Sequence, residues 1–306
     1  HLEKEMNTYL NNVLKSSNVD YVVAGDTDSL YLNFQPLVDK VCSNKTQDQI
    51  VKFLDKVGQE IQKGPIQRSI DAVYNLCNCY EKLMDYKREA IYSKGFWTAK
   101  KRYALMVHNS EGVEYKPYKL KIMGLDIVKA STPQVVRKQL KSMLPIIFEK
   151  GEKAMRDEVV RLKTDFLQLP PEQMAFPRSA NDIDKWADPK TVYKKGTPIH
   201  VRGSLLYNAH VRDVEPIQNG DKIKFIYLKM PNPIKEDCIS FPSQGKFPEI
   251  DPLLKFVNSG KSGTMFSQYV DKELMFEKVF ISPLQGITDA IGWSIEEKTD
   301  LSEFFG

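Results

Sequence analysis

Two carboxylates stand two residues apart, at Asp26 and Asp28, within the sequence Gly-Asp-Thr-Asp-Ser. In an extended strand, side chains two residues apart share one face, and at the tip of a hairpin both acids could point into one cleft. Paired carboxylates of this kind can hold a hard divalent cation. The other interpretation is a polar turn whose acids cap backbone amides, which an isolated D-x-D pattern favours.

Three consecutive cations, Lys100, Lys101 and Arg102, lie between the aromatic pair Phe96-Trp97 and Tyr103. Residues 93–130 contain eight Lys or Arg side chains against three acids, so a positive surplus gathers here. A basic patch with interleaved aromatic residues is typical of nucleic-acid binding. The alternative is a solvated strand edge, where lysines oppose aggregation.

The surrounding residues predict the elements that would position these groups. Residues 2–14 carry helical apolar spacing, and residues 21–24 and 30–34 read as two strands of a hairpin with the acids at its tip. We expect further helices over 50–61 and 66–76, broken at Gly64-Pro65, and strands over 82–92 and 103–107. A sheet covered by helices is the simplest assembly, which places the chain in the α+β class.

The pattern changes near residues 130–133, where we expect a domain boundary. Residues 136–148 predict a helix interrupted by Pro145, and residues 155–166 continue a helical face. Residues 176–251 are rich in Pro, Gly, Asn and Asp, which predicts a region of loops between helices.

Composition narrows the class of protein. The 306 residues are 42% hydrophobic and 27% charged, as in globular proteins, and no apolar run is long enough to span a membrane. The net charge is only +4, so any affinity for nucleic acid must come from local clusters. Four cysteines without a C-x-x-C pair favour reduced thiols and a cytosolic setting. Because the chain opens within a helix, at a residue other than Met, we expect a piece of a longer polypeptide.

The motifs carry a resemblance to a known family. Residues 21–31, Y-V-V-A-G-D-T-D-S-L-Y, resemble the third polymerase motif of family B DNA polymerases, and residues 100–103, K-K-R-Y, resemble their primer-gripping motif. Residues 121–126, 131–133 and 199–203 are similar to the C-terminal palm and thumb of T4-like bacteriophage polymerases. The resemblance implies the C-terminal part of a palm over 1–130, an antiparallel sheet with packed helices. It implies a mostly helical thumb over 131–295 and a clamp-binding tail over 296–306.

The resemblance also implies roles for individual residues. Asp28 matches the carboxylate that bridges two metal ions, and Asp26 matches the auxiliary acid that orients the site. Glu89 resembles a further acid near the metals, although a salt bridge with Arg88 or Lys87 is an equal alternative. The residues expected to contact DNA are Lys100, Lys101, Arg102, Tyr103, Lys121, Lys129 and Arg202. For Arg202, a structural ion pair is an equally good interpretation.

The implied reaction is template-directed nucleotidyl transfer to a primer by two Mg²⁺ ions. In the family, another metal-binding Asp and a triphosphate-gripping Lys precede the third motif, and only 25 residues precede Asp26 here. We therefore expect the isolated chain to be inactive and to share its Mg²⁺ ions with a carboxylate that this chain lacks. Ala24 stands where the family commonly has an aromatic residue, so a packing contact near the primer end would be missing or supplied otherwise.

The implied partners are primer–template DNA, deoxynucleoside triphosphates, an N-terminal polymerase part with exonuclease, remaining palm and fingers, and a sliding clamp. Leu301, Phe304 and Phe305 in the C-terminal tail would bind the clamp, or else fold back on the thumb. The implied location is the cytoplasm of an infected bacterial host, with no membrane partner.

Two other functions stay open at this stage. A non-catalytic subunit could bind duplex DNA and tether it to a clamp, although intact acids at Asp26 and Asp28 disfavour such a binder. An unrelated α+β protein with a chance D-x-D turn is the third possibility, which the joint presence of both motifs and the tail disfavours.

Overall fold

The computed structural model describes residues 1–188, 196–210, 215–232, 234–244 and 266–297. The chain divides into two compact units, one of residues 1–95 and 99–121, the other of residues 96–98 and 122–306. Helices are mixed with antiparallel sheets in the chain, which confirms the predicted α+β class. Among the described residues, no helix is long and apolar enough to cross a membrane.

The first unit opens with the predicted helix, α1 (Leu2–Leu14). Its apolar positions bury Met6 and Leu10 in a small core with Tyr21 and Ile61. The core therefore joins α1 to the start of the acidic hairpin and to the end of the long helix α3 (Gln47–Ile61). A shorter helix, α2 (Gln35–Val41), follows the hairpin.

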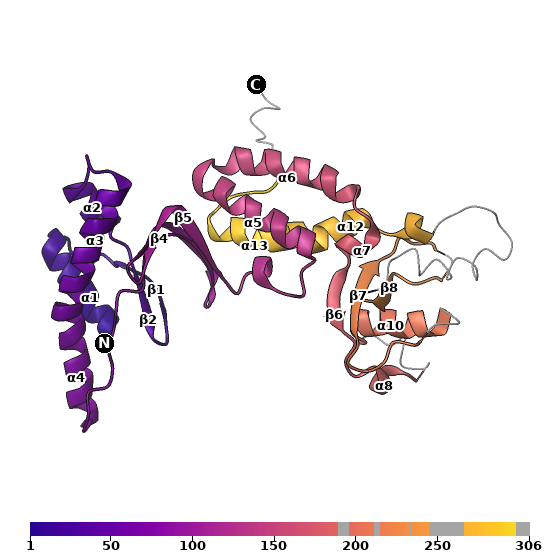
Figure 1. Ribbon diagram of the computed structural model, residues 1–306, viewed down its shortest axis with the longest axis horizontal. Coiled ribbons are helices and arrows are strands. Elements are labelled where there is room, and N and C mark those ends of the chain that lie inside the picture. The colour runs from indigo at the N-terminus through magenta and orange to yellow at the C-terminus, as the bar shows by residue number, and fades with distance from the viewer. Residues whose placement is uncertain (189–195, 211–214, 233, 245–265, 298–306) are drawn as a thin grey trace. The chain divides into compact units, whose positions relative to one another are not determined.

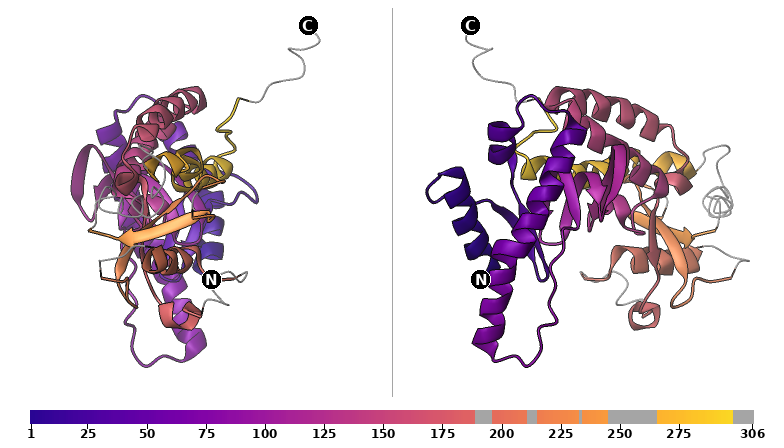
Figure 2. Two further views of the ribbon diagram at one scale, coloured as in Figure 1. Left: turned by 90° about the vertical axis from the view of Figure 1, so that its right-hand side faces the viewer. Right: turned by 60° about the vertical axis from the view of Figure 1, so that its left-hand side comes forward.

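The predicted break at Gly64-Pro65 is wrong. Helix α3 continues through a π-helical turn (Gln62–Ile66) into α4 (Gln67–Cys77), and Figure 2 shows the three segments as one continuous rod. Proline lacks a backbone N–H and so cannot donate the hydrogen bond of a regular α-helix. Because the hydrogen bonds of a π turn span one residue more, the turn accommodates Pro65 without ending the helix. At the other end, Thr46 and Gln49 form a reciprocal capping box that fixes the start of α3.

The predicted acidic hairpin is confirmed. Strands β1 (Val22–Asp26) and β2 (Ser29–Leu32) pair antiparallel, with Asp26 opposite Ser29. Thr27 and Asp28 form the two-residue turn, in which Thr27 has a positive φ of 35°.

Three consecutive strands form the next sheet: β3 (Ala90–Ala99), β4 (Arg102–Ser110) and β5 (Val113–Met123). The strand predicted over 103–107 is confirmed, and all five of these residues are buried. The strand predicted from residue 82 is wrong, because residues 82–89 pair with no other strand and β3 begins at Ala90. Side-chain contacts hold this segment instead.

In the second unit, α5 (Gln134–Glu149) and α6 (Glu152–Leu167) pack together (Figure 1). The predicted interruption at Pro145 is wrong, since α5 runs through it. A proline removes the hydrogen bond to the carbonyl four residues earlier, here that of Lys141, a residue exposed to water that can solvate the freed oxygen. Thr132 and Pro133, which lead into α5, are buried.

A third sheet corrects the expectation that residues 176–251 form loops between helices. The described residues of the second unit are still mostly helical, as expected. Strands β6 (Phe176–Ser179), β7 (Lys222–Tyr227) and β8 (Cys238–Pro242) pair antiparallel in that order. Helix α10 (Ile199–His210) packs on β8 so closely that a Cβ on Gly203 would lie 2.7 Å from the backbone nitrogen of Ser240.

The remaining elements of the second unit are short. They comprise a 3-10 turn (Asp126–Val128), α7 (Pro171–Met174), α8 (Ile183–Trp186), a 3-10 turn (Phe266–Tyr269), α12 (Lys272–Phe276), a π-helical turn (Glu277–Ile281) and α13 (Ser282–Ala290). Apart from residues 96–98, the chain passes from the first unit to the second between Lys121 and Ile122, before the predicted boundary near residues 130–133. The assignment of palm and thumb to the two parts stays a prediction.

Candidate functional site

The acidic hairpin presents its two carboxylates differently. Asp26 ends β1 with its side chain only 22% exposed, and it accepts a hydrogen bond from the Thr27 hydroxyl at 3.2 Å. Ser29 donates to the Asp26 carbonyl, also at 3.2 Å. Asp28 lies exposed in the turn itself. Asp26 is therefore held in place by the turn, while Asp28 faces solvent.

The structure brings the acidic hairpin and the basic motif together. Lys100 and Lys101 form the turn between β3 and β4, and their Nζ atoms lie 3.7 and 3.9 Å from Asp26 Oδ1. Both lysines are about two-thirds exposed, so each pair is weakly stabilising and its cation keeps access to other anions. Two motifs more than seventy residues apart thus form a single site of mixed charge.

Three tyrosines form ring contacts that join the acidic hairpin to strands β3 and β4. Tyr31 on β2 lies edge to face with Tyr103 on β4, with ring centroids 5.6 Å apart, and its ring is 6.5 Å from that of Tyr92 on β3. Burial, together with a hydrogen bond to Tyr31, raises the pKa of Tyr103 well above its ordinary value of 10.0. Burial likewise raises the pKa of Tyr92. The hydroxyls therefore stay protonated at neutral pH and able to donate.

Sequence reasoning missed Tyr31 and Tyr92 as parts of the site. Tyr31 is the cross-strand partner of Ala24, and Ala24 lies two residues before Asp26 on the same strand. Opposed residues of an antiparallel pair share a face, so Tyr31 is on the face of Asp26. The strand alternation around the hairpin could have revealed this position. Tyr31 also places an aromatic ring beside Ala24, which is the position at which the family commonly has an aromatic residue.

Glu89 joins the same site, but its ion-pair partner is neither Arg88 nor Lys87, the two neighbours named in the alternative interpretation. Its carboxylate contacts Lys121 Nζ at the end of β5, while Arg88 pairs with Asp55 and Lys87 with Asp85. The negative charges of Glu89 and Asp26 also contribute to the raised pKa of Tyr103, after burial and Tyr31. Tyr103 thus lies within the field of two of the three predicted site acids.

The carboxylates of the acidic hairpin are ligands of the kind that Mg²⁺ prefers. Asp26 and Asp28 supply them at one hairpin tip. Over the ranges that the structure describes, no three His, Cys, Asp or Glu side chains are placed to hold one metal ion. The carboxylates of this hairpin would therefore form part of a metal site.

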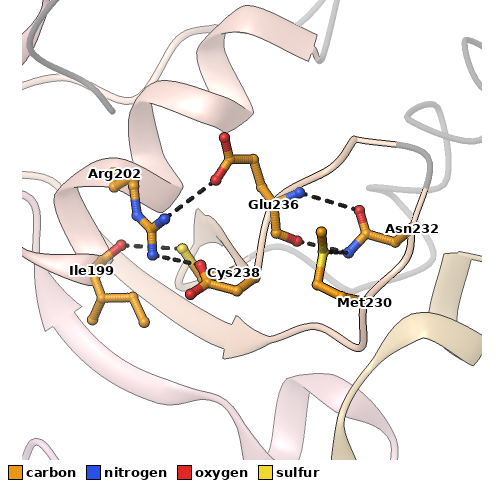
Figure 3. Close-up of polar contacts among 7 residues, drawn as sticks. Ile199, Arg202, Met230, Asn232, Glu236 and Cys238 are labelled. Atoms are coloured by element: carbon orange, nitrogen blue, oxygen red, sulfur yellow. Dashed lines mark hydrogen bonds and ion pairs between the residues drawn. The ribbon is translucent and has the colours of Figure 1, made fainter. Parts of the chain in front are cut away.

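Of the other predicted DNA contacts, Arg102 directly follows Lys101, and Lys129 and Arg202 belong to the second unit. Arg102 is half-buried at the start of β4. In the second unit, Lys129 pairs with Asp126 at 3.0 Å, and Arg202 pairs with Glu236 at 3.2 Å and Asp237 at 2.5 Å (Figure 3). Arg202 thus makes the structural ion pairs named as its alternative. Leu301, Phe304 and Phe305 lie outside the described residues.

No family model matches the chain. The chain is 34% identical over 317 aligned positions to the DNA-directed DNA polymerase of Escherichia phage RB69, with 99% of the chain covered. It is 32% identical to the DNA-directed DNA polymerase of Enterobacteria phage T4, with the whole chain covered.

The similarity is to a class of template-copying enzyme, the DNA-directed DNA polymerases. Within that class, it confirms the resemblance to the polymerases of T4-like bacteriophages. The chain spans 34% of the length of either relative, so it is similar to about a third of such a polymerase.

Proposed function

We propose that this chain is the C-terminal part of a DNA-directed DNA polymerase that adds deoxynucleotides to a primer during phage DNA replication. One observation carries the proposal: the D-T-D-S hairpin and the K-K-R-Y turn, each similar to a polymerase motif, lie together with Asp26 beside Lys100 and Lys101. A metal-binding acid next to a cation that can bind primer phosphates would suit nucleotidyl transfer at a primer end.

The two hairpin acids have separate parts in this proposal. Asp28, exposed in the turn, would bridge two Mg²⁺ ions, and Asp26 would orient the site and hold the lysines near it. When bound, the ions supply activation of the primer 3′-hydroxyl and stabilisation of the triphosphate and its leaving group. In the family another metal-binding Asp precedes the third motif, so a further ligand would come from another part of the polymerase.

The basic turn would hold the primer strand. Lys100 and Lys101 are exposed at the tip and can contact phosphates, which stabilises a duplex without reading its sequence. Tyr103 and Arg102 would support this contact from β4. Lys121, Lys129 and Arg202 would contact the product duplex only by exchanging their present carboxylate partners for phosphates.

The same proposal specifies partners. The chain would act with an N-terminal polymerase part that carries the exonuclease, the fingers and the rest of the palm, and would be inactive by itself. The C-terminal tail would bind a sliding clamp, and the complex would act in the cytoplasm of the infected bacterial host. Its substrates would be primer–template DNA and deoxynucleoside triphosphates.

Primer extension with Mg²⁺ tests the proposal. The chain is mixed with a separately made N-terminal part of a T4-like polymerase, and Asp28→Ala is compared with Asp39→Ala, which removes an exposed carboxylate on α2. We expect extension only in the mixture, lost in Asp28→Ala and kept in Asp39→Ala. Extension by the chain alone would overturn the predicted inactivity. Duplex binding without extension, unchanged in Asp28→Ala, would instead indicate the clamp-tethering subunit.

A further inference from the structure

The segment of residues 80–89, which leads into β3, is held to the helices by side chains. Lys82 pairs with Asp71 at 2.6 Å, the Met84 amide donates to the Tyr74 hydroxyl, and Gln62 donates to Asp85 at 3.4 Å. Most of these contacts are exposed, so each contributes little by itself. The last contact of the series, at Arg88, is different in kind.

Arg88 joins three parts of the first unit. Its side chain is 20% exposed; Nη2 contacts the Asp55 carboxylate on α3, and Nη1 donates to Asn109 Oδ1 on β4 at 2.6 Å. Asn109 is buried, and its Oδ1 also accepts from the Gly112 amide at 3.2 Å in the β4–β5 turn. A Cβ on Gly58 of α3 would lie 3.2 Å from Arg88 Cγ, so the helix approaches Arg88 closely at this glycine.

These contacts fix the backbone on either side of Glu89. The Glu89 carbonyl accepts from the Glu111 amide at 2.8 Å and, more weakly, from Arg88 Nη1 at 3.4 Å. Beyond it, β3 begins at Ala90. Glu89 therefore lies between an anchored arginine and a strand, which directs its carboxylate toward Lys121.

We infer that Arg88 is a positioning residue, which holds Glu89 at the candidate site by clamping residues 88–89 to Asp55 and Asn109. The clamp is suited to this task because a guanidinium offers several donors in a fixed plane and can hold two acceptors at once. The surface pair of Lys87 with Asp85 provides the contrast, because Lys87 is 78% exposed and contacts neither Glu89 nor β4 in the described structure. The part of the inference that concerns activity rests on the proposed function.

The first experiment needs no activity. Hydrogen exchange is measured on the full chain for Arg88→Gln, for the milder Asp55→Asn, and for the control Lys87→Gln. Exchange of the Glu111 amide, whose acceptor is the Glu89 carbonyl, should rise at least about tenfold in Arg88→Gln, less in Asp55→Asn, and stay unchanged in Lys87→Gln. Amides of the β7–β8 pair serve as a reference within the chain. Unchanged protection of Glu111 in both clamp variants would overturn the inference.

The second experiment asks whether Arg88 acts through Glu89. In the extension assay with the N-terminal part, Arg88→Gln and Glu89→Gln should each lower kcat by about 10- to 100-fold with little change in the KM for nucleotide. The double variant should be no slower than Glu89→Gln. If Arg88 acts only through Glu89, its replacement has no further effect on kcat once Glu89 has been replaced. Losses that multiply would overturn the inference. If the unmodified mixture does not extend primers, the proposed function fails, and the exchange result still decides whether Arg88 holds Glu89.

Discussion

The rings of Tyr31 and Tyr103 meet edge to face, with their centroids 5.6 Å apart. One ring comes from the acidic hairpin and the other from the strand that follows the basic turn, so the contact sets the distance between the two motifs. Edge-to-face pairs add about 0.5–1.5 kcal/mol beyond the area that they bury. The proximity of Asp26 to Lys100 and Lys101 therefore depends on an uncharged contact between two tyrosine rings.

Alkaline pH should weaken the first unit through these tyrosines. Burial raises the pKa of Tyr103 above the value of 10.0 that it has when unfolded. A raised pKa in the folded state gives stability that is fully present below pH 10.0 and is lost as the pH rises further. Unfolding by denaturant across this range, with absorbance titration of tyrosinate, measures the effect. Tyr103→Phe should cost about 1 kcal/mol at neutral pH and flatten the alkaline decline. The exposed Tyr80→Phe should change neither, and an equal decline in Tyr103→Phe would contradict the assignment.

The lysines of the basic turn should contribute to duplex affinity in a salt-dependent way. Lys100→Ala and Lys101→Ala should each reduce the slope of log affinity against log salt by about one. Lys87→Ala, which removes an exposed cation paired with Asp85, is the matched control. Fluorescence anisotropy on a labelled primer–template, with the chain in its mixture with the N-terminal part, provides the measurement. A slope that stays the same in both variants would exclude phosphate contacts at this turn.

Arg202 should contribute to the stability of the second unit. Its side chain is 23% exposed and neutralises Glu236, which is only 14% exposed and whose pKa is raised by burial. Arg202→Gln leaves this carboxylate without its cation, and we expect the free energy of unfolding to fall by about 1–3 kcal/mol. Chemical denaturation monitored in this unit tests the expectation. A variant of unchanged stability with a weaker duplex affinity would show that Arg202 binds DNA in place of an ion pair.

The glycines at 203 and 286 should respond oppositely to alanine. A Cβ at Gly203 would lie 2.5 Å from Ser240 Oγ and 2.7 Å from the Ser240 backbone nitrogen, so Gly203→Ala must push α10 away from β8. We expect a loss of about 1–3 kcal/mol. Gly286 lies within α13 and has open space around its Cα, so Gly286→Ala should stabilise by about 0.5–1 kcal/mol. Thermal unfolding of the two variants side by side shows whether their effects have opposite signs.

The spacing of apolar residues predicts the helices and strands whose pattern repeats within a short stretch of the chain. The apolar spacing that predicts α1 and α4 repeats over at least two helical turns. The alternation that predicts the acidic hairpin likewise covers more than one residue pair beside the Thr27-Asp28 turn. Proline was misjudged twice, at Pro65 and Pro145, because its effect depends on whether the helix can widen or its freed carbonyl can reach water. The short strand β6 contains Pro177 and carries too few residues to show alternation.

The site was predictable as a list of residues but not as an arrangement. The sequence identified Asp26, Lys100 and Glu89, yet their proximity depends on pairings between distant segments that spacing alone does not specify. Arg88 gave no pattern of its own, because its partners Asp55 and Asn109 lie 33 and 21 residues away. Such tertiary contacts decide which charged residues meet.

The π-helical turn at residues 62–66 has a consequence for the length of the chain. A π turn holds one residue more than an α-helical turn and is equivalent to a single inserted residue. Deleting Pro65 would let α3 and α4 merge into a regular α-helix and leave Ile61 and Ile70, at 3% and 6% exposed, on their present faces. Single-residue differences in length between natural variants should therefore be tolerated at this turn and rejected within α3 or α4.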